Sequence, residues 1–367
     1  MSGSIFKEVA FTPQTFDKAS FLDDMRKFEK LLNAMDDLSE SGIIVGVYSD
    51  WLDKTTELIE KYDESEKYDI QEVLKFLNDR QRIVSTPKNE SFSDDEDVWV
   101  TQAKKLSQIR KFDLIIASKD LDGAQQINSL GRKTLKNKGA IVTPQSKENM
   151  TNILAPILGY ADIVTIIDPY FHLESDKKRF EIALDIICSA LGNKHGIKNK
   201  SIIDIHTSIK PLTEGYPKEF VWQKTENWPK MIKEFEEKYG HIITINIWEE
   251  AKKANEWHDR WIITNQCGVA LGKGSDVSEW TDATWGILDW DELPVISNKF
   301  NKNRQIYTYI GSVNSSEATR ERFPKHTDSR MTEAEKRNKQ LELERELKRR
   351  EDERLAKSAN KKVLSWQ

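Results

Sequence analysis

Short apolar runs alternate with amphipathic segments along most of this chain. The apolar runs lie at residues 42–50 (GIIVGVYSD), 112–118 (FDLIIAS), 139–143 (GAIVT), 162–171 (DIVTIIDPYF), 201–209 (SIIDIHTSI) and 241–248 (HIITINIW). Runs of this length, bounded by polar turns, predict buried strands, whereas the segments between them have the spacing of helices. A chain in which strands and helices alternate in this way is expected to form an α/β fold with largely parallel sheets.

The order of these segments predicts two α/β domains followed by a tail. We expect residues 1–148 to form a Rossmann-like domain with a parallel sheet, and residues 149–325 to form a second domain with a mixed sheet. In residues 326–367, acidic side chains precede basic ones by four positions, as in Glu344 and Lys348, which favours a charged helix. This helix is expected to be solvated or to contact a protein partner.

Composition narrows the class of protein further. The net charge of −5 argues against a protein that coats nucleic acid without specificity. No apolar run reaches 18 residues, and the first residues lack the pattern of a signal peptide, so we expect a cytoplasmic protein without integral membrane association. The two cysteines, Cys188 and Cys267, exclude a disulfide framework and a multi-cysteine zinc site.

The segment WHDRWIITNQCGVALGKGSD (257–276) has the most unusual spacing in the chain. If it forms two strands around a hairpin, His258 and Arg260 project from the same face, because side chains two apart on a strand do so. An imidazole can attack phosphorus as a nucleophile, and a guanidinium can bind two phosphate oxygens at once. The pair therefore predicts a site that handles phosphate esters.

This segment resembles the signature of the phospholipase D superfamily, in which a lysine follows the histidine by two residues and an aspartate follows five residues later. It is closer to the phospholipase D-like domain of MIT-domain proteins, which carries the HDR triplet, an asparagine in place of the acid and a similar glycine turn. The resemblance covers about residues 160–315. It implies that His258 is a nucleophile or phosphate contact, that Asn265 is an orienting partner, and that a phosphate clamp is formed by Arg260, Gly272, Lys273 and Gly274.

The chain departs from that family in ways that leave its chemistry open. Arg260 replaces the lysine, and Asn265 replaces the acid and cannot supply its charge. In the family, two histidine motifs meet, so a chain with a single motif is expected to form a homodimer in order to assemble a catalytic site. His206, His172 and Asp168 are the candidates for a second group within one chain.

Carboxylates in the N-terminal half suggest a second possible site. Asp50, Glu72, Asp97 and Asp120 fall near predicted strand ends and helices, where they could converge on Mg²⁺ or Mn²⁺. This arrangement is similar to that of PIN-type ribonuclease domains, although Ser118 stands where the first acid of that family's turn belongs. The alternative is a Rossmann-like domain that packs against the second domain.

Taken together, the sequence predicts recognition of a phosphodiester, preferably nucleic acid, with cleavage as an open possibility that would make the protein a nuclease. No cofactor is expected for the phospholipase D-like domain. The resemblance to bacterial relatives implies a prokaryotic antiviral defence or conflict system. Two alternatives stay open: a non-catalytic module that binds a protein partner or lipid, and a metal-dependent ribonuclease in the N-terminal half.

Overall fold

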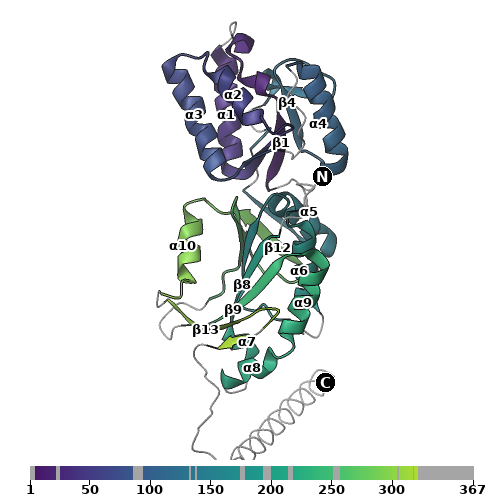
Figure 1. The fold of residues 1–367 in the computed structure, drawn as a ribbon, viewed down its shortest axis with the longest axis vertical. Coiled ribbons are helices and arrows are strands. Elements are labelled where there is room, and N and C mark those ends of the chain that lie inside the picture. Colours follow the sequence, from purple (N-terminus) through teal and green to yellow (C-terminus); the bar gives the residue numbers. More distant parts are fainter. Residues whose placement is uncertain are drawn as a thin grey trace, which may run out of the picture.

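The computed structural model describes residues 5–21, 25–85, 94–131, 134–136, 139–173, 178–192, 200–213, 218–250, 257–303, 306–316 and 318–320. The fold is α/β and is built on two sheets, as the alternation of strands and helices predicts. The two sheets belong to two units stacked along the long axis of the molecule (Figure 1). We call residues 5–136 the N-terminal unit and residues 139–320 the C-terminal unit. The predicted charged helix in residues 326–367 lies outside the described residues.

The N-terminal unit contains a parallel sheet of five strands in the order β3-β2-β1-β4-β5. Helices α1, α2 and α3 lie on one side of this sheet and α4 lies on the other (Figure 1). The central strand, β1, is a five-residue stretch, KEVAF, whose last four residues are buried. The bounds are β1 Lys7–Phe11, α1 Met25–Ser41, β2 Gly42–Gly46, α2 Trp51–Ile59, α3 Glu64–Asp79, β3 Ile83–Ser85, α4 Glu96–Arg110, β4 Leu114–Ala117 and β5 Gln125–Gln126.

The C-terminal unit contains a mixed sheet in the order β14-β13-β9-β8-β7-β10-β11-β12-β6. Strands β7, β8 and β9 are parallel, and every other neighbouring pair is antiparallel. The strand bounds are β6 Ala140–Gln145, β7 Ile163–Ile167, β8 Ile202–Ser208, β9 Ile242–Glu250, β10 Trp261–Thr264, β11 Gly268–Leu271, β12 Ser278–Ile287, β13 Tyr307–Val313 and β14 Ala318–Arg320.

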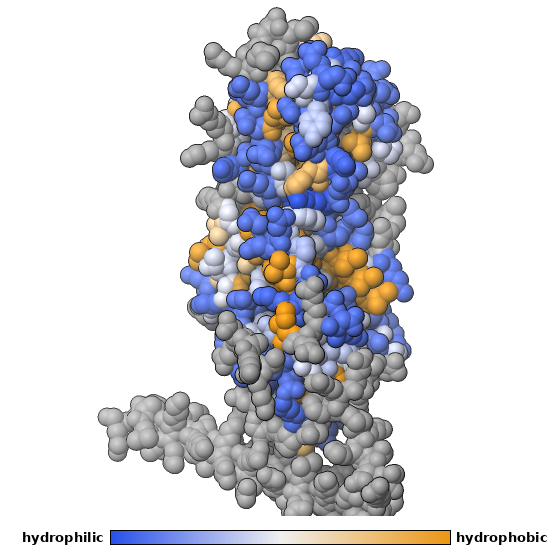
Figure 2. All heavy atoms as spheres, turned by 90° about the vertical axis from the view of Figure 1, so that its left-hand side faces the viewer, coloured by the Kyte–Doolittle hydropathy of each residue, from blue (hydrophilic) through white to orange (hydrophobic). Residues whose placement is uncertain are grey.

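Helices cover both faces of this sheet. Helices α5, α6 and α9 lie on one face and α10 lies on the other (Figure 1). The side of the molecule that carries α3 and α10 is largely hydrophilic over the N-terminal unit and shows more apolar surface over the C-terminal unit (Figure 2). The helix bounds are α5 Lys147–Leu158, α6 Arg179–Ala190, α7 Ile209–Leu212, α8 Val221–Lys224, α9 Trp228–Tyr239 and α10 Glu292–Lys299. No helix among the described residues is both long enough and apolar enough to cross a bilayer.

One predicted strand belongs to the other sheet. The run at 139–143 was expected to be the third strand of the N-terminal sheet, but it forms β6 at the edge of the nine-stranded sheet, antiparallel to β12. Its burial alternates between exposed and half-buried positions, which is typical of an edge strand. The place of a third strand is filled instead by β1, a segment too short and too charged to stand out as an apolar run.

The two units meet at the turn between α3 and β3. The side chain of Arg82, only 2% exposed, donates a hydrogen bond from Nε to the carbonyl of Gln266 at 2.8 Å and another to the carbonyl of Ser39. The Gln266 side chain donates back to the carbonyl of Gln81 at 2.7 Å. Because Gln266 lies in the turn between β10 and β11, the N-terminal unit contacts the hairpin that carries the His258 segment.

Candidate phosphate site

The residues that follow β7 meet both ends of the β10–β11 hairpin at one end of the nine-stranded sheet. Strand β10 runs antiparallel to β7, with Trp261 opposite Ile167. The residue that follows β7, Asp168, therefore lies beside the residues that precede β10, His258 to Arg260. The turn after β11, which contains Ser275, comes to the same end because β11 pairs antiparallel with β10.

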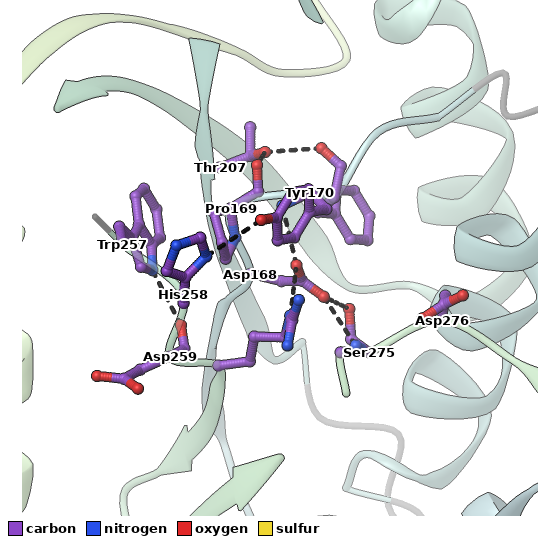
Figure 3. A network of polar contacts seen from close by, with 12 residues as sticks. Asp168, Pro169, Tyr170, Thr207, Trp257, His258, Asp259, Ser275 and Asp276 are labelled. Carbon is purple, nitrogen blue, oxygen red and sulfur yellow. Dashed lines mark hydrogen bonds and ion pairs between the residues drawn. The ribbon is translucent and has the colours of Figure 1, made fainter. Parts of the chain in front are cut away.

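Asp168 is the centre of the polar contacts at this end. Its side chain is fully buried, and its Oδ2 accepts hydrogen bonds from the Ser275 backbone N–H at 2.7 Å and from the Ser275 hydroxyl at 2.8 Å (Figure 3). Its Oδ1 accepts from the backbone N–H of Tyr170 at 2.9 Å and lies 3.7 Å from Nε of Arg260. We call Asp168, Tyr170, Arg260 and Ser275 the Asp168 network.

The glycine turn is shaped to fit this network. Gly274 has a φ of +114°, and a Cβ built on it would lie 3.3 Å from Oδ2 of Asp168 and 3.4 Å from Cδ of Arg260. Only glycine avoids both the strained backbone and the close approach. The carbonyl of Gly274 accepts a hydrogen bond from the Gln145 side chain at 2.6 Å, which ties the turn to the end of β6.

Asp168 and Tyr170 hold the Arg260 side chain in place without using all of its hydrogen-bond donors. Its side chain is 18% exposed, and its Nε is buried without a hydrogen-bond partner among the described residues, since Asp168 is 3.7 Å away. Its guanidinium carbon lies 4.9 Å from the centre of the Tyr170 ring, within the range of a cation–π contact. A guanidinium has five N–H donors, so Arg260 can still donate hydrogen bonds to the oxygens of a phosphate.

Tyr170 connects Arg260 to His258. Its hydroxyl lies 3.2 Å from Nδ1 of His258, and Figure 3 shows the two side chains pointing toward each other. The turn that carries Tyr170 is fixed from β8, because the Thr207 hydroxyl donates to the carbonyl of Phe171 at 2.7 Å. Tyr170 and His258 both line a cavity of about 580 Å³. Tyr170 thus contacts both the guanidinium of Arg260 and the imidazole of His258, and the imidazole lies at the edge of the cavity.

A neighbouring ion pair borders the network. Arg179, at the start of α6, contacts the carboxylate of Asp276 at 2.9 Å. Burial raises the pKa of Asp276, the nearby charge of Asp168 raises it further, and Arg179 opposes both effects. The start of α6 is therefore tied to the same glycine turn.

The prediction that His258 and Arg260 lie on a strand is wrong. Strand β10 begins at Trp261, and residues 257–260 form no regular element. The pairing with β7 ends at Ile167, because the chain turns away at Asp168, so the residues before Trp261 have no β7 residue opposite them. The carbonyl of Arg260 still accepts a hydrogen bond from the Leu271 N–H of β11 at 2.9 Å. The two side chains still reach the same site.

Asn265 lies elsewhere. It follows the far end of β10, where its Oδ1 accepts a hydrogen bond from the backbone N–H of Asp162 at 3.2 Å and its amide donates to the side chain of Gln81. The expectation that Asn265 is an orienting partner at the site is therefore wrong, because the four residues of β10 separate it from Arg260. Asn265 instead joins the C-terminal unit to the N-terminal unit.

The predicted phosphate clamp is only partly assembled. Gly274 packs against Arg260 and Asp168, as described above. Gly272 uses its backbone N–H for the carbonyl of Thr284 at 2.8 Å, and Lys273 is exposed in the turn. Of the predicted clamp, the structure places Arg260 in the Asp168 network and Gly274 against it, and gives Lys273 no contact with it.

The two candidates for a second imidazole, His206 and His172, both pack against aromatic rings. His206 accepts a hydrogen bond from the Trp248 indole at 2.9 Å and packs 4.9 Å from the Phe300 ring, and burial lowers its pKa to about 4. At neutral pH it is uncharged. His172 packs against Phe180, and its Nδ1 is 3.0 Å from the carbonyl of Tyr170. Asp168, the third candidate, is the residue that the structure does bring into the site.

The predicted metal ligands of the N-terminal half do not gather. Asp97 pairs with Lys119 at 2.9 Å, Glu72 is exposed on α3, Asp120 is exposed after β4, and Asp50 is the N-cap residue that precedes α2. Within the ranges described above, no three histidine, cysteine or acidic side chains form a group that could hold a metal ion. These residues therefore do not fit Mg²⁺ or Mn²⁺ in the arrangement that the sequence suggested.

Three residues that make hydrogen bonds important for the fold or the site are not indicated by the sequence. Ser275 and Tyr170 complete the Asp168 network, and only their closeness to the DPYF and GKGSD stretches could have pointed to them. In the N-terminal unit, the buried Glu96 accepts hydrogen bonds from the Ser118 hydroxyl at 2.6 Å and from the Thr12 hydroxyl at 2.5 Å. Ser118, which occupies the position of the first acid in the PIN-type turn, thus donates a hydrogen bond to the carboxylate of Glu96.

Comparison with known proteins adds little. No protein-family model matches the chain, and no curated protein matches it. Among solved structures, the chain is similar to TrmBL2, an archaeal chromatin protein whose structure shows a novel mode of DNA binding, at 12% identity and a TM-score of 0.24. The match covers 47% of this chain and 54% of that one. The chain thus spans about half the length of that protein.

Proposed function

We propose that the C-terminal unit recognises a phosphodiester, with nucleic acid as the ligand, through Arg260 and His258. The observation that carries this proposal is the position of Tyr170. Its hydroxyl is 3.2 Å from His258 Nδ1, and its ring is 4.9 Å from the guanidinium of Arg260. Two groups that can bind phosphate oxygens therefore contact one tyrosine, and His258 and Tyr170 line the cavity beside it.

The side chains at the site would have separate roles in binding the phosphate. Arg260, backed by the buried carboxylate of Asp168 at 3.7 Å, would bind two phosphate oxygens. Tyr170 engages Nδ1 of His258, so the contact with phosphate would be made by Nε2. Asp168 and Ser275 would act as positioning residues, because they hold the turn and the arginine without reaching the ligand.

Recognition without cleavage is favoured for a single chain. A leaving oxygen needs an acid, and His206, with a pKa of about 4, is almost wholly uncharged at pH 7. Cleavage would therefore require His258 from a second copy of the chain. A homodimer with nuclease activity is the form in which the proposal would extend to catalysis.

Binding of a fluorescent single-stranded oligonucleotide, followed by anisotropy, tests the proposal. Arg260→Ala should weaken binding about tenfold or more, because a charge-assisted hydrogen bond contributes about 1.5–3 kcal/mol. His258→Ala should weaken binding less. Lys233→Ala removes a positive charge on α9 that pairs with Glu237 at 3.7 Å, and it should leave affinity unchanged. Equal affinities for wild type and Arg260→Ala would refute the proposal.

A further inference from the structure

The cavity beside the candidate site has a wall that the phosphate contacts do not use. Besides Tyr170 and His258, it is lined by α7, by the end of β9 and by Lys218. Its volume of about 580 Å³ falls in the range of roughly 300–1,000 Å³ that small-molecule pockets occupy. The apolar part of the wall is formed by Pro169, Ile209, Pro211 and Trp257.

The charged part of the wall consists of two lysines, each of which is paired with a glutamate. Lys218 forms an ion pair with Glu249, and Lys210 lies 3.9 Å from Glu250. The glutamate side chains are only 25% and 18% exposed. Two carboxylates next to two lysines disfavour a further phosphate, since each lysine already has a counter-charge. They favour an uncharged group that carries N–H or O–H donors, which carboxylates accept strongly.

We propose that this cavity binds the nucleoside attached to the phosphate that Arg260 and His258 hold. This inference rests on the proposed function and adds the part of the ligand that is not phosphate. Tyr170, which is 40% exposed, lines the cavity and contacts Arg260, and its ring offers a base a surface on which to stack. Glu249 and Glu250 accept hydrogen bonds from the sugar hydroxyls or the amino groups of the base.

The same wall argues against a lipid tail. An acyl chain seated in the cavity would remove two lysine–glutamate ion pairs from water without offering them a hydrogen bond, and that desolvation is costly. A nucleoside is flat, has apolar faces and carries donors at its edges, so it matches both parts of the wall.

The test compares a single-stranded oligonucleotide with an abasic phosphodiester chain of equal length, in competition against the labelled oligonucleotide. Wild type should bind the abasic chain about tenfold or more weakly, since stacking of a base contributes about 1–3 kcal/mol. Glu250→Gln and Glu249→Gln should each reduce this discrimination severalfold. Glu237→Gln, which removes a carboxylate 3.7 Å from Lys233 on α9, should leave it unchanged.

The outcomes separate the two proposals. Equal affinity for the abasic chain and the oligonucleotide, with both lost in Arg260→Ala, would overturn the nucleoside pocket and leave phosphate recognition standing. No binding of either chain would overturn both proposals. Tighter binding to vesicles of phosphatidylglycerol than to the oligonucleotide would assign the cavity to lipid and overturn the inference.

Discussion

Replacing Asp168 with alanine should destabilise the C-terminal unit strongly. The carboxylate accepts three hydrogen bonds: from the Ser275 N–H at 2.7 Å, the Ser275 hydroxyl at 2.8 Å and the Tyr170 N–H at 2.9 Å. Ser275 is fully buried, so alanine leaves both of its donors without an acceptor. Each such donor costs about 1–3 kcal/mol, and Arg260 also loses its counter-charge, so we expect a loss of about 3–5 kcal/mol.

The assay is unfolding in guanidinium chloride, followed by the fluorescence of the chain's 11 tryptophans. Asp168→Asn keeps one acceptor in place and should lie between wild type and alanine. The matched control is Asp97→Ala, which removes an exposed carboxylate 2.9 Å from Lys119 and should change the free energy of unfolding by less than about 1 kcal/mol. An Asp168→Ala protein as stable as the Asp97→Ala protein would refute the reasoning.

Three further changes test other parts of the molecule. Tyr170→Phe keeps the ring but loses the hydroxyl 3.2 Å from His258, so oligonucleotide affinity measured by anisotropy should fall severalfold, and unchanged affinity would contradict that role. The pKa of His206 is about 4 when folded and 6.5 in its unperturbed state, so the unfolded chain binds the proton more tightly; stability should be full above pH 6.5 and fall by about 2 kcal/mol from pH 7 to pH 5. An NMR titration of His206 with a midpoint near pH 6.5 would contradict this prediction. Arg82→Ala removes the 2.8 Å hydrogen bond to Gln266 between the units and should cost about 2–4 kcal/mol in chemical unfolding, whereas a cost below about 1 kcal/mol would show that this contact is dispensable.

The sequence predicted the elements whose signal is local. The runs at 42–50, 112–118 and 162–171 each contain a strand, because buried parallel strands are continuously apolar. It did not predict which sheet the strand at 139–143 joins, since its partner β12 lies more than 130 residues away. Strand β1 was missed because its five residues include a lysine and a glutamate.

The candidate site was predicted where its residues are close in sequence. His258 and Arg260 are two apart, and both do lie at the site. The contact between Asp168 and Ser275 spans 107 residues and depends on how β7, β10 and β11 pair, which no local pattern reveals. Asn265 was misplaced for the same reason, because spacing alone does not say at which end of β10 a side chain lies.

The salt dependence of oligonucleotide binding tests the central claim most directly. A guanidinium that neutralises a phosphate releases a counterion, so the slope of log affinity against log salt reports the number of such contacts. We predict that Arg260→Ala lowers the magnitude of this slope by about one contact relative to wild type, and that Lys233→Ala leaves it unchanged. An identical slope for wild type and Arg260→Ala, with measurable binding by both, would show that Arg260 does not contact phosphate.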